Sequence, residues 1–142
     1  MKILSPIAAL ACAALVAACA INQNVRPVAA TGLSEVCIKS NPQVMMGEFL
    51  PELRKQVESR GVKTSVYTGD RPASCRHHLE YSANWRWDMA MYLAFAKLDV
   101  YEDNLLVGQA TYDALGGGFN MNKFGATADK LRVLVDQLFP KK

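Results

Sequence analysis

The chain has 142 residues, a length that suits one domain and leaves no room for a second of ordinary size. Its composition, 51% apolar and 20% charged, is that of an ordinary globular protein. The net charge of +3 is small and scattered along the sequence, which excludes the concentrated basic surface of a nucleic-acid-binding protein.

The first 18 residues are predicted to be a signal peptide that is absent from the mature protein. Lys2 and the free amine make the start positive, and residues 3–16 are almost wholly apolar. That apolar run is too short to cross a membrane comfortably as a helix. Its removal leaves 124 residues with a net charge of +2, and a domain of that size buries about two-thirds of its unfolded surface without needing a metal.

Residues 16–19, Val-Ala-Ala-Cys, close the apolar run and resemble the bacterial lipobox. In proteins with that motif the cysteine sulfur takes a diacylglyceryl group as a thioether before the signal peptidase cuts, so the resemblance implies lipidation of Cys19. Ordinary cleavage is the alternative, because Ala18-Cys19-Ala20 also fits a small-residue cleavage site. Residue 20 is not aspartate, which by resemblance to enterobacterial sorting implies the outer membrane, with the protein facing the periplasm.

The other three cysteines sort by position. Cys12 lies in the signal peptide and leaves with it, whereas Cys37 and Cys75 remain as an even pair in an oxidising compartment, which predicts a disulfide. In the chain-entropy model this bond, which closes a loop of about 39 residues, stabilises the fold by about 4 kcal/mol. A metal or redox pair is the alternative, but the two cysteines are not in a CxxC spacing.

Residues 19–34 are predicted to be the lipidated cysteine followed by a flexible tether, and residues 35–142 a single domain. From residue 21 to residue 34 the sequence lacks periodicity and contains Pro, Gly, Asn and Gln. If flexible, this segment spans about 20 Å on average, so the domain is expected to stand just off the membrane surface.

The first half of the domain is predicted to contain a strand, a helix and a second strand. The first strand is short, at residues 36–38. The helix begins near Glu48, carries Pro51 in its first turn and stops at Gly61. The second strand covers residues 62–68.

Residues 79–89 show the clearest pattern in the sequence, a strict alternation of apolar and polar side chains that is typical of a half-buried strand. Aromatic side chains at this spacing usually belong to a core, so we predict that Trp85 and Trp87 both lie beneath the helices. Truncation of either ring is then expected to cost about 3–5 kcal/mol. The alternative is a pair of exposed rings that stack on a glycan or on a partner.

The second half of the domain continues as a meander and ends in a helix. After a turn near residues 88–91, strands at about 92–101 and 105–114 are joined by a hairpin turn at Asp103-Asn104. A glycine-rich loop leads to a helix at residues 127–138 with one apolar face. The order β-α-β-β-β-β-α predicts an α+β fold, a two-layer sandwich with one mixed sheet and both helices on one face.

Side chains that can carry chemistry are sparse. His77 and His78 are neighbours in a strand and point to opposite faces, so they cannot chelate one ion together. Asn84, Arg86 and Asp88 share the polar face of their strand and are the candidate binding residues, although a solvated sheet face explains them more simply. We therefore predict no catalytic residue, no metal and no cofactor, and we expect the chain not to be an enzyme.

From residue 36 to residue 138 the chain resembles a family of small proteobacterial lipoproteins of uncharacterised activity. The residues that carry the resemblance are Cys37, Cys75, the stretch Tyr81-Ser82-Ala83-Asn84-Trp85-Arg86-Trp87-Asp88, Gly108-Gln109-Ala110-Thr111-Tyr112 and Lys123-Phe124. It implies a periplasm-facing, disulfide-containing α/β domain. The order of elements is also similar to that of envelope assembly lipoproteins, which is an analogy at the level of fold.

These features favour a non-enzymatic binding or envelope-assembly module, with an envelope protein or peptidoglycan as its partner. The alternative is a periplasmic small-ligand binder or hydrolase that uses the polar face around Asn84, Arg86 and Asp88. A flat polar surface favours the first function, and a deep pocket at those residues favours the second.

Overall fold

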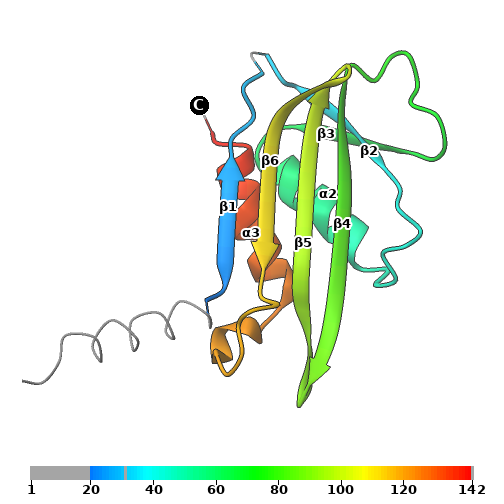
Figure 1. Cartoon of the computed structure of the whole chain (residues 1–142). Helices are drawn as coiled ribbons and strands as arrows, with labels where there is room; N and C mark the ends of the chain where they lie inside the picture. The colour runs from blue at the N-terminus through cyan, green and yellow to red at the C-terminus, as the bar shows by residue number, and fades with distance from the viewer. Residues whose placement is uncertain (1–19, 31, 142) are drawn as a thin grey trace, which may run out of the picture.

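The computed structural model describes residues 20–30 and 32–141 (Figure 1). The elements are β1 (Asn22–Arg26), β2 (Glu35–Lys39), α2 (Phe49–Ser59), β3 (Lys63–Tyr67), β4 (His77–Asp88), β5 (Ala90–Glu102), β6 (Leu105–Asp113), the 3-10 helix η1 (Met121–Lys123) and α3 (Thr127–Leu138). No helix in this part of the chain has the length and apolar character needed to span a membrane.

All six strands form one mixed sheet in the order β1-β6-β5-β4-β2-β3. β2 runs parallel to β3 and to β4, and the remaining neighbours are antiparallel. Both helices pack on the same face of this sheet (Figure 1). The predicted α+β fold, with two layers and one mixed sheet, is therefore confirmed.

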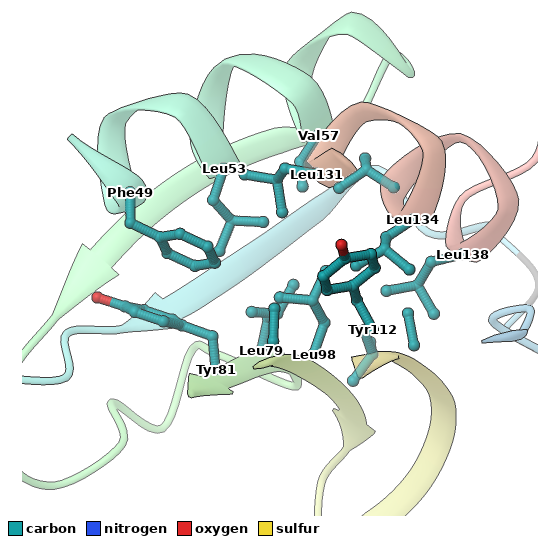
Figure 2. Packing of buried hydrophobic residues seen from close by; sticks show 14 of the residues in the cluster. Phe49, Leu53, Val57, Leu79, Tyr81, Leu98, Tyr112, Leu131, Leu134 and Leu138 are labelled. Atoms are coloured by element: carbon teal, nitrogen blue, oxygen red, sulfur yellow. The ribbon is translucent and has the colours of Figure 1, made fainter. Parts of the chain in front are cut away.

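The core lies between the helices and one face of the sheet. Leu53 and Val57 of α2 and Leu131 and Leu134 of α3 are fully buried. They project toward the sheet residues that Figure 2 shows opposite them, which include Leu79, Tyr81, Leu98 and Tyr112. Each helix presents apolar side chains at helical spacing and each strand at alternate positions, so the two patterns meet in a single layer.

The predicted flexible tether is wrong for its first part, because Asn22–Arg26 form the edge strand β1, paired antiparallel with β6. The chain then stays attached, since the Val28 amide donates to the Leu138 carbonyl at 2.9 Å and the Ala29 amide to the Val107 carbonyl at 2.9 Å. Val28 packs closely over Gly108 of β6, where any larger residue would clash, because a Cβ at Gly108 would lie only 2.7 Å from Val28 Cγ2. The edge strand is polar and mostly exposed, so backbone hydrogen bonds hold it without the apolar alternation that marks a strand in a sequence.

The long hairpin of β4 and β5 differs from the prediction near its tip. It turns at Met89, which has a φ of +62°, and its register shifts between Asn84 and Trp85. Figure 1 shows the hairpin projecting beyond both helices at this end. Trp85 packs against the core as predicted, but Trp87 is 71% exposed. Its placement in the core was wrong, because at that point of the strand there is no helix left to cover it.

Candidate functional site

The predicted disulfide between Cys37 and Cys75 is confirmed. The two Cα atoms are 5.8 Å apart, and both residues are buried. The bond ties β2 to the loop that precedes β4, where Arg71 Nη1 donates to the Cys75 carbonyl at 2.7 Å. Cys19, the predicted lipidation site, lies outside the described residues.

The three predicted binding residues do not form one site. Asn84, Arg86 and Asp88 are exposed, and in the described part of the chain no side-chain hydrogen bond or ion pair involves Asn84 or Arg86. Asp88 accepts a hydrogen bond at 2.5 Å from Lys123 Nζ, which lies 35 positions further along the chain. Asp88 is therefore separated in role from Asn84 and Arg86: its carboxylate takes part in a contact between the hairpin and the loop after β6.

Lys123 is the centre of that contact. Its side chain is almost fully buried, and besides Asp88 its ammonium donates to the Gly118 carbonyl at 2.6 Å. The same ammonium lies 5.2 Å from the ring centroids of Tyr92 and of Phe124, a cation–π arrangement. A buried ammonium with this set of partners fixes the loop to the β4–β5 hairpin.

A second lysine reinforces the same loop. Lys130 of α3 donates through Nζ to the carbonyl of Lys123 and lies 5.2 Å above the ring of Tyr112. Burial lowers the pKa of Lys130 because it disfavours the charged ammonium. The loop between β6 and α3 is thus held from both sides, although it contains the run Gly116-Gly117-Gly118.

Exposed apolar side chains surround this contact. We call them the apolar end: Trp87, Met89 and Met91 of the hairpin, and Leu115, Phe119 and Met121 of the loop. Phe119 is 99% exposed and Met89 82%. Ile21, directly before β1, reaches the same loop, since a Cβ on Gly117 would lie 3.5 Å from Ile21 Cγ1.

The sheet face opposite the helices is polar, and its side chains are paired both within β5 and between neighbouring strands. Lys39 lies 3.8 Å from Glu80, Lys97 lies 3.2 Å from Asp99, and Gln109 donates to Asp99 at 2.6 Å. We call this surface the outer face.

His78 lies on the same side of β4 and stacks on Tyr101, with ring centroids 5.0 Å apart. Burial lowers the pKa of His78, and the nearby positive charge of Arg71 lowers it further. The neutral ring therefore serves as an aromatic packing partner on the outer face.

A groove with a volume of about 610 Å³ lies at the other end of α3, between the segment after β1 and the C-terminal residues. Its lining includes Val28, Arg60 and Phe139 but none of the predicted binding residues. Arg60 is already engaged there, because it donates to the Phe139 carbonyl at 2.8 Å and lies 3.4 Å from Asp136. Within residues 20–30 and 32–141, no three His, Cys, Asp or Glu side chains gather as a metal site does.

Sequence reasoning named Lys123 only as part of a resemblance and predicted neither its burial nor the apolar end. A lone lysine in a loop carries no sign that it will be buried, because its partners come from the β4–β5 hairpin and from Gly118. The exposed apolar residues gave a clearer signal: Leu115, Phe119 and Met121 stand in a glycine-rich loop, outside any periodic element.

Comparison with known proteins defines the fold alone. No family model matches the sequence, and no curated protein matches it significantly. Among solved structures, the PelC dodecamer from Paraburkholderia phytofirmans is similar, with a TM-score of 0.55, 9% identity, and 87% of this chain and 99% of that chain covered. A leucine-to-methionine variant of that PelC dodecamer gives a TM-score of 0.54 and 10% identity over 84% of this chain and 95% of the other.

Proposed function

We propose that this chain is an exported lipoprotein, held by acylated Cys19 on the periplasmic side of the outer membrane. Its domain is a non-enzymatic binding or assembly module for an envelope protein or for peptidoglycan. The Cys37–Cys75 bond supports export, because such bonds persist in oxidising compartments.

The observation that carries the binding role is the outer face. It is a broad polar surface, left open because both helices pack on the opposite side of the sheet. Its charged side chains neutralise one another in pairs, and the small hollow that reaches this face is lined by Lys39 and Glu80 but not by Ser82 or Asn84. A broad polar surface whose charges are already paired suits a macromolecular partner better than a small ligand, which needs a deep concave site.

The alternative, a small-ligand binder or hydrolase around Asn84, Arg86 and Asp88, has less support. Lys123 already forms an ion pair with Asp88, and among the described residues no hydrogen bond or ion pair orients the side chains of Asn84 and Arg86.

Replacement of Cys19 by serine tests the anchor. Because serine cannot form the thioether, the Cys19→Ser protein is expected to lose all acyl labelling by a palmitate analogue and to leave the membrane fraction. The disulfide lies far from this position in the sequence, so the variant should still contain no free thiol among Cys37 and Cys75. Continued labelling and membrane fractionation of the variant would contradict the anchor.

The binding role is tested by photocrosslinking in intact cells. A photoreactive residue at Ser82 or Asn84, both exposed on the outer face, is expected to give a discrete crosslinked product. The matched control is the same residue at Gln137, which is exposed on α3. The mass of the product distinguishes an envelope protein or a glycan strand from a second copy of this chain. A second copy has to be considered because the PelC protein of similar fold is a dodecamer. Equal labelling from both surfaces would contradict a binding role of the outer face.

A further inference from the structure

The apolar end concentrates large, solvent-exposed apolar side chains in one place. Six large apolar side chains stand there on two adjacent chain segments, and Trp87, Met89, Phe119 and Met121 are each at least 69% exposed. Clustered exposure of this kind marks a surface that meets an apolar or interfacial partner. Tryptophan and phenylalanine are also side chains that enter the boundary between lipid headgroups and acyl chains.

The apolar end is rigid rather than loose. The buried ammonium of Lys123 links Asp88 in the hairpin to Gly118 in the loop, so the exposed neighbours of both residues are held side by side. The hairpin turns on the single residue Met89, which leaves that side chain at the tip. Because the two segments that carry these side chains are already held together, less conformational entropy is lost when a surface covers them.

The charges at this end are arranged so that contact with lipid costs little. Lys123 and Asp88 neutralise each other, and the Asp113 carboxylate accepts the amide of Leu115 at 2.9 Å. Arg86 is exposed beside them without an acidic partner among the described residues. An exposed guanidinium next to apolar side chains suits a bilayer surface with anionic headgroups.

The covalent chain fixes which surface this end meets. Ile21 packs against the loop at Gly117, and Cys19 precedes it by only two residues. Two residues of any conformation span at most about 7 Å, so a lipid on Cys19 enters the bilayer close to the apolar end. Because β1 is paired with β6, no flexible tether separates the domain from its anchor.

We propose that the apolar end lies directly against the bilayer that holds acylated Cys19, with Trp87 and Phe119 in the interfacial layer. The proposal rests on the lipid anchor proposed above. It gives the domain one orientation: the long axis of the hairpin points away from the membrane, and the groove at the other end of α3 faces the periplasm.

The test uses Trp87 as a reporter of membrane contact. The full-length lipoprotein is purified, acylation of Cys19 is checked by mass spectrometry, and the protein is reconstituted into phosphatidylethanolamine–phosphatidylglycerol vesicles with and without brominated acyl chains. In the Trp85→Phe variant Trp87 is the only tryptophan. Its emission is expected to shift to the blue on reconstitution, to lose most of its intensity with brominated lipid, and to resist aqueous acrylamide.

The matched control is Trp87→Phe, which leaves Trp85 beneath the helices as the only tryptophan. Its emission is expected to be the same in plain and brominated vesicles. If Trp85→Phe does not fold, the difference between the wild type and Trp87→Phe reports Trp87 alone.

Each other outcome overturns the proposal in a recognisable way. If Cys19 is acylated but the emission of Trp87 stays red-shifted and is quenched by acrylamide, the apolar end faces water. The anchor then stands, and only the orientation is wrong. If Trp87 is protected from acrylamide but not quenched by brominated lipid, a second copy of the chain covers it. If mass spectrometry finds no acyl group, the anchor itself fails, and the orientation fails with it.

Discussion

Truncation of Trp85 to alanine is expected to lower the free energy of unfolding by about 2–4 kcal/mol, slightly less than the ~3–5 kcal/mol typical of a fully buried tryptophan. The ring packs edge-on against Phe49 of α2, with centroids 5.7 Å apart, and its Nε1 donates to Thr127 Oγ1 at the start of α3. It therefore joins both helices to the sheet at one position. Its removal leaves a cavity and an unpaired hydroxyl group.

The same substitution at Trp87 is the matched control, because the two residues are of one type and two positions apart. Trp87 is 71% exposed, so its truncation is expected to change the free energy of unfolding by no more than about 0.5 kcal/mol. Urea denaturation of the Cys19→Ser protein, which needs no membrane, measures both variants. Equal losses of stability would mean that Trp87 is also core and would contradict the bulged hairpin described above.

Loss of the Cys37–Cys75 bond is the second large expected effect. The double replacement Cys37→Ala/Cys75→Ala is expected to lower the free energy of unfolding by about 2–5 kcal/mol. The bond joins residues 38 positions apart and restricts the unfolded chain. Without the bond, the conformational entropy of the unfolded chain increases, which favours unfolding. In the folded protein it also holds the segment before β4 against β2.

Urea denaturation of the oxidised protein, the reduced protein and the double variant measures this effect. The reduced protein and the double variant are expected to agree, since both lack the bond, and the double variant should not respond to reductant. Thiol counting on the denatured, unreduced mature protein should find neither cysteine free. Two reactive thiols there would contradict the bond.

The sequence allowed most of the sheet and both helices to be predicted, because their periodicity depends on local geometry. Helix α3 begins at Thr127 and ends at Leu138, as its apolar spacing predicted. The alternation in residues 79–89 correctly placed Leu79 and Tyr81 inward. It failed at Trp87 because alternation tells which side a residue faces and not whether another element covers that side.

For the candidate site, the sequence by itself determined which two cysteines form the disulfide and which strand positions carry polar side chains. The two cysteines that remain after the predicted signal peptide leave one possible disulfide, and polar residues at alternate strand positions leave one solvated face. These conclusions need only local geometry and valence, so they did not depend on how the layers meet.

Only the tertiary structure decided how the two ends of the domain differ. A polar segment becomes the edge strand β1 because β6 offers free backbone groups, and Lys123 is buried because Asp88 and Gly118 converge on it from distant positions. Both are contacts across long stretches of sequence, and they leave no periodic signal. The same packing places Ile21 beside the apolar end, which turns scattered exposed residues into one surface.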